Sequence, residues 1–344
     1  MNGKRGVAAN LLTRTGIIAA INRVRPRISN KLTILAYHRV LDVENEDSYP
    51  FDIDLISAST AGFREQMRLL RRHYNPITFA TLLDHQRTGT PLPPGAAIVT
   101  FDDGFDDNFR NAFPILKETG VPATIFLTTS FIDGQRTIWF EALAYRVMCA
   151  PPTTVRLAAQ PGVSIEVRRD RSSRRRVLHS LLEVLKRVPN RERLALLADL
   201  ERQLPVGEDL AAYRASQPLS WAQIREMSRE GIEFGSHSVT HPILSMLTPE
   251  ELRFELETSR QRIEVETGRP VHVLAYPVGG RNAFSPDVKR AARSAGYELG
   301  VSYLRGVQDP SNWDPFEIRR IHVERYIDMR MFAATLALPE AFIP

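Results

Sequence analysis

Cysteine is nearly absent from this chain of 344 residues, which contains one, Cys149. A single cysteine excludes an intrachain disulfide framework and any zinc site built from cysteine thiolates. A transition metal, if the protein binds one, must therefore be held by histidine, aspartate or glutamate. Cys149 itself is expected to be a small buried hydrophobic residue.

Long apolar runs are also missing. In the basic N-terminal segment, residues 1–30, no uncharged stretch is longer than that from Thr15 to Asn22, which is too short for a signal-peptide core or a membrane-spanning helix. We therefore expect a cytoplasmic protein, or one held at the inner membrane surface. Apolar residues such as Leu11 and Ile17 beside Arg14 suit an amphipathic helix. Such a helix packs on the domain, the preferred interpretation, or makes peripheral contact with an anionic membrane.

Nucleic-acid motifs are lacking as well, and the net charge of +5 is modest for this length. Residues 168–176, RRDRSSRRR, form a local basic patch that would attract nucleic acid, phospholipid headgroups or anionic glycans. No aromatic residue interleaves this patch, so we expect no nucleic-acid partner and interpret the patch as a solvated helix face. Peripheral membrane contact through this patch is the alternative.

Short, nearly continuous apolar runs recur along the chain and are separated by helical patterns. Such runs are typical of parallel strands that helices cover, and they predict an α/β barrel or a doubly wound sheet. The runs are residues 31–40, 96–101, 123–129, 231–236, 271–277 and 297–303.

Helix ends are signalled clearly in two places. Thr248, Pro249 and Glu251 predict a capped helix start, with an end at Gly268. Residues 140–218 break the strand–helix rhythm with Arg- and Leu-rich helical sequence and a possible short strand pair, so we interpret them as an insertion within the barrel domain.

The strand-like run at 96–101 leads into four closely spaced aspartates, in the sequence IVTFDDGFDDNF (98–109). Crowded carboxylates repel one another unless a cation or a shared proton offsets the repulsion. We interpret Asp106 as a cap of the helix that begins near Asp107, and Asp107 as a first-turn carboxylate. Asp102 and Asp103 remain as candidates for a metal site.

A second strand-end loop, GSHSVTHP, carries His237 and His241 four positions apart. In a parallel barrel such loops meet at one rim. One carboxylate and two imidazoles form the ligand set of catalytic zinc, although other divalent metals also fit. Neighbouring side chains diverge, so one of Asp102 and Asp103 can bind the ion while the other acts as general base toward water. This pattern predicts hydrolysis by a metal-activated water.

Three motifs, TFDDGF (100–105), HSVTHP (237–242) and AYPVGG (275–280), resemble those of the polysaccharide deacetylases, the NodB-homology or carbohydrate esterase family 4 domain. The resemblance covers roughly residues 31–330. It implies a distorted (β/α) barrel of about seven units over 31–335, a divalent metal, most often zinc, and removal of an acetyl group from a sugar.

The same resemblance implies roles for individual residues. Asp102 would be the general base, and Asp103, His237 and His241 would be the metal ligands. The segment Tyr276, Pro277 and Val278 would face the substrate, with the Val278 N–H holding the oxyanion. This segment departs from the family's Arg-Pro-Pro-Tyr motif, so the arginine that would hold the base is missing; Arg319 and Arg320 are candidate replacements.

Two histidines are candidates for the general acid. His322, in IRRIHV, is the nearest match to a late Leu-x-His motif of the family, and His38, in AYHRV, lies at the end of the first strand and therefore on the same rim. Either one could instead be a hydrogen-bonded structural histidine. The aromatic residues Trp139, Phe140 and Trp221 could line a sugar cleft, but core packing is the preferred interpretation.

The leading hypothesis is therefore a metal-dependent deacetylase that acts on an N-acetylated amino sugar of an oligosaccharide, polysaccharide or lipid-linked glycan. One alternative is a hydrolase of a non-sugar amide on the same fold. Another is a glycan-binding protein whose catalytic machinery has decayed.

Overall fold

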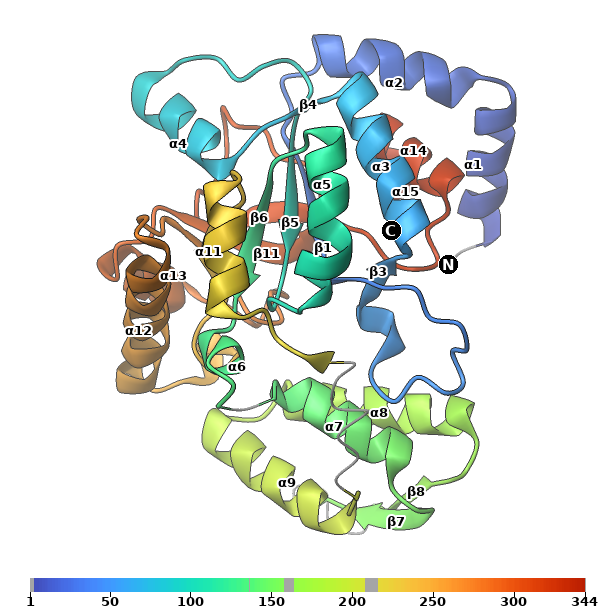
Figure 1. Ribbon diagram of the computed structural model, residues 1–344, viewed down its shortest axis with the longest axis vertical. Coiled ribbons are helices and arrows are strands. Elements are labelled where there is room, and N and C mark those ends of the chain that lie inside the picture. The colour runs from blue at the N-terminus through green and yellow to red at the C-terminus, as the bar shows by residue number, and fades with distance from the viewer. Residues whose placement is uncertain (1–2, 136, 158–163, 208–215, 344) are drawn as a thin grey trace.

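The protein is a closed parallel β-barrel surrounded by helices, as Figure 1 shows. The computed structural model describes residues 3–135, 137–157, 164–207 and 216–343. Seven parallel strands pair in a ring, and a short additional strand, β4 (Asn75–Pro76), extends the sheet beside β5. In the order of the ring the strands are β1 (Thr33–Tyr37), β12 (Ile318–His322), β11 (Leu299–Arg305), β10 (Val273–Ala275), β9 (Glu233–Ser236), β6 (Ala123–Leu127) and β5 (Ala96–Phe101), which pairs back to β1. The predicted barrel is confirmed.

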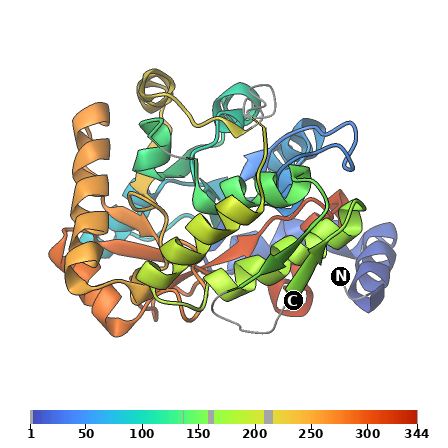
Figure 2. The same cartoon turned by 90° about the horizontal axis from the view of Figure 1, so that it is seen from below.

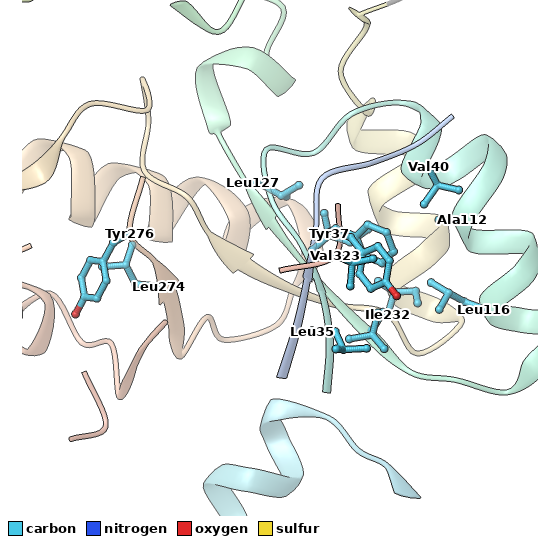
Figure 3. Packing of buried hydrophobic residues seen from close by; sticks show 14 of the residues in the cluster. Leu35, Tyr37, Val40, Ala112, Leu116, Leu127, Ile232, Leu274, Tyr276 and Val323 are labelled. Carbon is cyan, nitrogen blue, oxygen red and sulfur yellow. The ribbon is translucent and has the colours of Figure 1, made fainter. Parts of the chain in front are cut away.

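Both faces of the strands are buried, which explains their continuous apolar sequence. Leu35 and Tyr37 of β1 point outward, where Tyr37 packs edge-to-face on Phe63 at 5.2 Å between ring centroids. Ile34 points the other way and joins Ile98 in the cluster that fills the barrel. Figure 3 shows the outer layer, in which residues from β1, β6 and β10 contact the covering helices.

Helices surround the barrel. They are α3 (Thr60–His73), α4 (Phe79–Thr88), α5 (Phe113–Thr119), α6 (Thr129–Ile132), α11 (Trp221–Arg229), α12 (Pro249–Thr267), α13 (Pro286–Ser294), α14 (Met329–Ala337) and α15 (Pro339–Phe342). The helix α12 begins with the predicted capping box, in which Thr248 and Glu251 bond each other's backbone N–H groups, and it ends at Gly268. A two-stranded ladder, β2 (Arg39–Val40) with β3 (Ile56–Ala58), lies beside the barrel.

The segment that follows α6 forms a helical lobe at one end of the barrel (Figures 1 and 2). This lobe contains α7 (Trp139–Cys149), the hairpin β7 (Thr153–Arg156) and β8 (Ser164–Val167), α8 (Arg171–Leu185) and α9 (Asn190–Gln203). It has its own apolar cluster, which includes Leu143, Leu181 and Leu200.

The expected solvated basic patch holds for Arg168, Arg169 and Arg176, which are exposed, but not for Arg174, and the burial expected of Cys149 is wrong. Arg174, in the basic patch, is 5% exposed, and its guanidinium donates to the carbonyls of Val147 and Ala150 at 2.6 and 2.8 Å. Part of the patch therefore satisfies the free carbonyls at the end of α7 and is not a solvated helix face. Cys149 is exposed because it occupies the outer side of the last turn of α7.

The N-terminal segment forms two helices, α1 (Gly3–Arg14) and α2 (Ile17–Ile28), which join at Gly16 in the left-handed conformation (φ 77°). Their inner side packs on the C-terminal helices, where Ala9 and Ile18 contact a cluster that contains Ala334 and Phe342. Among the described residues no helix has both the length and the hydropathy needed to cross a membrane.

Candidate active site

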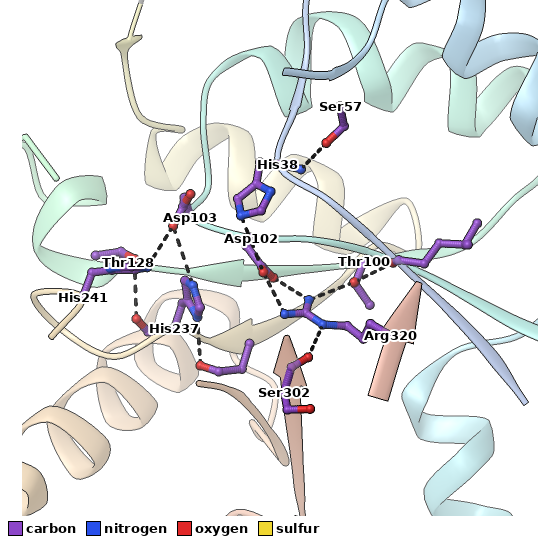
Figure 4. A network of polar contacts seen from close by, with 12 residues as sticks. His38, Ser57, Thr100, Asp102, Asp103, Thr128, His237, His241, Ser302 and Arg320 are labelled. Atoms are coloured by element: carbon purple, nitrogen blue, oxygen red, sulfur yellow. Dashed lines mark hydrogen bonds and ion pairs between the residues drawn. The ribbon is translucent and has the colours of Figure 1, made fainter. Parts of the chain in front are cut away.

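The carboxylate of Asp102 lies inside the barrel at the carboxyl end of β5. Side chains alternate along a strand, so the inward-facing Ile98 and Thr100 place Asp102 inward as well. Arg320 of β12 donates from Nη1 and Nη2 to the two Asp102 oxygens, at 2.8 Å each (Figure 4). The Arg320 side chain is 0% exposed and also donates from Nε to the Ser302 carbonyl at 2.9 Å.

This pairing sets the charge of Asp102. Burial alone would raise the pKa of the carboxyl, but the Arg320 guanidinium and its hydrogen bonds hold that pKa well below its usual range. Asp102 is therefore ionised and oriented at neutral pH. Of the two candidate replacements for the missing third-motif arginine, Arg320 makes this contact, whereas Arg319 lies on the opposite, half-exposed side of β12.

The next residue, Asp103, turns away from Asp102 because its backbone is left-handed (φ 75°). Gly104 continues the turn at φ 84°, where a Cβ atom would lie 2.9 Å from the side chains of Ile132 and Leu127. The Asp103 Oδ1 atom lies 3.7 Å from His237 Nε2 and 3.5 Å from His241 Nε2 (Figure 4). The three sequence-predicted metal ligands are thus brought together.

The charges of Asp103, His237 and His241 suit the binding of a cation. Both Asp103 carboxylate oxygens are buried and accept no hydrogen bond from the described residues. Burial and the neighbouring Asp102 raise the pKa of Asp103 well above its usual range, and burial lowers the pKa of both histidines, which therefore present neutral imidazoles. The His237 Nδ1–H donates to the Ala275 carbonyl at 2.8 Å, which leaves the Nε2 lone pair toward Asp103. The buried Asp–His–His group could bind a divalent metal.

Glu255, on α12, holds the histidine loop in place. Its carboxylate accepts hydrogen bonds from the N–H groups of Val239 and Thr240 at 2.7 and 2.9 Å. This residue was not among the predicted site residues. A signal was present in the sequence, because Glu255 stands between Leu252 and Leu256 on the apolar stripe of a helix, where an unpaired carboxylate would be costly.

Val278 lies at the third motif with an unusual backbone. Its φ is 63°, and among the described residues the non-glycine positions with positive φ are Asp103, Ser238, His241 and Val278, all of which lie at this site. Left-handed backbone is strained for a β-branched residue and commonly marks functional sites. Val278 lines the pocket that also contains Asp102.

Tyr276 differs from the expectation for this segment. Its ring stacks on Phe284 with centroids 4.6 Å apart, and its hydroxyl donates to the Phe316 carbonyl at 3.0 Å. The hydroxyl therefore points into the outer core (Figure 3), although another part of Tyr276 lines the pocket.

The two candidate general acids have different surroundings. His38 lines the pocket, and its Nε2 atom lies 4.0 Å from Asp102 Oδ2. Burial lowers the pKa of His38 to about 4, although Asp102 opposes this effect. His322 instead stacks on Tyr303, accepts a hydrogen bond from Arg305 at Nδ1 and lines a separate cavity of about 330 Å³. The structure therefore brings His38 to Asp102 and leaves His322 behind the ring of Tyr303.

The pocket has a volume of about 230 Å³, and the helical lobe forms one of its walls. Phe140 contacts the His241 ring edge-on at 5.0 Å between centroids, and the Trp139 indole N–H donates to the His241 carbonyl at 2.9 Å. Both residues also pack in the apolar cluster of the lobe, as the core-packing interpretation predicts, and the lobe in addition brings them to the pocket at the rim of the barrel. Trp221 does pack against the main core.

Neither of the remaining aspartates caps a helix. Asp107 is buried and accepts hydrogen bonds from Arg39 Nε at 2.8 Å and from the Val40 N–H at 2.9 Å. Asp106 pairs with Arg110 and accepts a hydrogen bond from the Gln223 amide. The capping role expected of Asp106 is wrong, because the π-helical turn η2 (Asn108–Ala112) begins here without a side-chain cap. Asp107 does lie at the start of this helix, as expected, but its carboxylate is bound by Arg39 and Val40.

The polysaccharide deacetylase family model matches residues 89–168 and 200–300 of this chain. Two curated relatives are poly-β-1,6-N-acetyl-D-glucosamine N-deacetylases, from Escherichia coli and Staphylococcus aureus. The E. coli protein is 31% identical over 110 residues, which are 32% of this chain and 16% of that protein. The S. aureus protein is 31% identical over 113 residues, which are 31% of this chain and 39% of that protein. The chain thus matches less than half of the length of these relatives.

Among solved structures, the deacetylase PplD of Streptococcus pyogenes, in complex with acetate, superposes with a TM-score of 0.59 at 17% identity. The superposition covers 91% of this chain and 99% of that one. At this identity the similarity shows the shared fold.

Proposed function

The chain belongs to the polysaccharide deacetylase family, and we propose that it is a metal-dependent hydrolase that removes the acetyl group from an N-acetylated amino sugar of a glycan. The observation that carries this proposal is the ionised Asp102, held by Arg320, beside the buried group of Asp103, His237 and His241. The relatives named as N-deacetylases support an N-acetyl substrate.

Asp103, His237 and His241 would hold the metal, with zinc as the proposed ion because two imidazoles and one carboxylate suit it. A bound divalent ion supplies a water of lowered pKa and polarises the acyl carbonyl. His237 is oriented for this task by its bond to the Ala275 carbonyl.

The proposed roles of the other residues follow from their positions. Asp102 accepts the proton of the attacking water, and Arg320 keeps its carboxylate ionised until then. The Val278 N–H donates to the oxygen that becomes negative as the carbonyl carbon turns tetrahedral. The C–N bond then breaks and acetate forms. The proton that Asp102 took from the water passes through His38, whose Nε2 lies 4.0 Å from Asp102 Oδ2, to the departing amine.

Aromatic side chains in the pocket walls support a sugar substrate. Trp139 and Phe140 from the lobe and Tyr303 from β11 line the pocket. Flat apolar faces of this kind suit the C–H faces of a pyranose ring.

The test is metal content and acetate release, measured on the same preparations. We expect about one zinc per chain and acetate release from N-acetylglucosamine oligomers. His241→Ala should lose both, because it removes one of three ligands, whereas His73→Ala, on the outer helix α3, should keep both.

Three outcomes would refute the proposal. Absence of metal binding after zinc or cobalt is added would remove the hydrolytic mechanism. Metal and sugar binding without acetate release would indicate a decayed binding protein. Hydrolysis of non-sugar amides alone would assign the same site to another substrate class.

A further inference from the structure

The outer side of α1 and α2 exposes large apolar side chains. Val7 and Leu11 of α1 are 70% and 61% exposed, and Ile17 and Val24 of α2 are 44% and 54% exposed. These are four of the eight large hydrophobic residues that are exposed in the described part of the chain. Since Ala9 is already buried against the C-terminal helices, α1 is apolar on two sides and only one of them has a partner within the fold.

The helix pair is anchored firmly, so this exposure is a property of the fold. The Asn22 side chain donates to the Ala333 carbonyl at 3.0 Å and accepts from the Tyr74 hydroxyl at 2.9 Å. Arg25 donates to the Ala337 carbonyl at 2.7 Å and pairs with Glu340. These bonds hold the inner side of α2 on the C-terminal helices, while the four apolar residues of the outer side face solvent.

The same outer side is positively charged. Residues 1–41 contain no aspartate or glutamate. Arg14, Arg23 and Arg27 are exposed between and beside the apolar residues. Arg72 continues this charge at the end of α3, because Arg72, Arg23 and Arg27 all lie close enough to His73 to lower its pKa, after burial as the main cause.

We propose that the outer side of α1 and α2 docks on the anionic surface of a lipid bilayer. Aliphatic side chains next to arginines fit the boundary between acyl chains and acidic headgroups. A nucleic acid would use the arginines but leave Val7, Leu11, Ile17 and Val24 in water. Protein interfaces are enriched in aromatic residues, and residues 1–36 contain none.

The position of the helix pair is compatible with this role. Figure 1 shows α1 and α2 along the outer edge of the barrel, at the end away from the lobe that walls the pocket. A bilayer bound there would leave the pocket uncovered.

Sedimentation with vesicles tests the proposal without reference to enzymatic activity. The wild-type chain should bind vesicles of phosphatidylcholine with phosphatidylglycerol and bind pure phosphatidylcholine far more weakly. Leu11→Ser/Val24→Ser should reduce binding on the order of tenfold, because interfacial binding scales with buried apolar area. Arg14→Gln/Arg23→Gln should reduce it and remove the preference for phosphatidylglycerol.

A matched control is available on α12, where Phe254 and Val265 are 53% and 70% exposed. Phe254→Ser/Val265→Ser should bind anionic vesicles as the wild type does. Metal content and thermal unfolding of every variant establish that the fold is intact, since none of the substitutions touches the pocket.

Failure of the wild type to bind anionic vesicles would overturn the proposal, as would equal binding to neutral vesicles or equal loss in the α12 control. A wild-type dimer in light scattering that becomes monomeric in Leu11→Ser/Val24→Ser would assign the surface to a second copy of the chain instead. All of these results are independent of whether the protein releases acetate.

Discussion

Replacing Arg320 by methionine isolates the contribution of one buried ion pair to both stability and catalysis. Methionine keeps most of the aliphatic volume but removes the charge, the two bonds to Asp102 and the bond to the Ser302 carbonyl. Removing one partner of a buried pair costs about 3–5 kcal/mol, because the other charge stays buried without compensation. This loss is a large part of a typical unfolding free energy of about 5–15 kcal/mol.

The pH dependence of this loss has a definite sign. In the wild type the pKa of Asp102 is depressed, so its contribution to stability is present above the unfolded pKa and is lost only as pH falls through the lower folded value. In Arg320→Met burial is unopposed and raises that pKa, so the variant loses stability as pH rises. The difference in unfolding free energy between the two proteins should therefore be smallest near pH 4 and grow toward neutral pH.

Urea unfolding at several pH values and the pH profile of acetate release measure these effects. The acid limb of the profile should move to higher pH in Arg320→Met, because Asp102 must be ionised to act as a base. Arg319→Met is the matched control and should cost less than about 1 kcal/mol, since Arg319 is half-exposed on the other side of the strand. In an Asp102→Asn background Arg320→Met should cost less than it does alone. A stability loss below about 1 kcal/mol, or one that does not vary with pH, would refute the reasoning.

Two further predictions concern strained or buried groups near the site. Burial raises the pKa of Glu141, which is 0% exposed, to about 7. The protonated carboxyl therefore leaves stability intact below the unfolded pKa of about 4.5, and the protein loses stability as pH rises from there to about 7. Glu141→Gln should lack this loss, so that thermal stability relative to wild type improves across this window by up to roughly 3 kcal/mol; parallel curves for the two proteins would contradict this. Because Val278 has a φ of 63°, Val278→Gly should be about 1 kcal/mol more stable than Val278→Ala, the reverse of the usual order. The glycine variant should keep activity because the backbone N–H remains. A more stable alanine variant would show that the strain is absent.

Several features could be predicted from the sequence because neighbouring residues determine them. Strands buried on both faces require continuous apolar runs, and these runs predicted a parallel α/β fold, either a barrel or a doubly wound sheet; the family resemblance selected the barrel. The capping box that begins α12 needs only residues three positions apart. His237, His241 and one of the two aspartates were predicted to meet because parallel strands bring their carboxyl ends to one rim, and the family resemblance indicated Asp103 as the third ligand.

Other features depended on contacts between distant segments. The choice of Arg320 over Arg319 follows from which side of β12 faces the barrel interior, and its partner Asp102 is 218 residues away. His38 lies at the pocket, rather than His322, because the ring of Tyr303 stands between His322 and the site. Composition gave no sign that Arg174 would be buried at the end of α7.

The difference between the features that the sequence predicted and those that it did not has one physical reason. Hydrophobic periodicity, turns and caps involve atoms close in sequence, so the sequence by itself determined the elements and the metal-ligand motifs. The partner of a charged side chain, and therefore its pKa and its role, is set by strand register and by the packing of the lobe on the barrel. Those contacts, which orient Asp102 and wall the pocket with Trp139 and Phe140, were decided only by the tertiary structure.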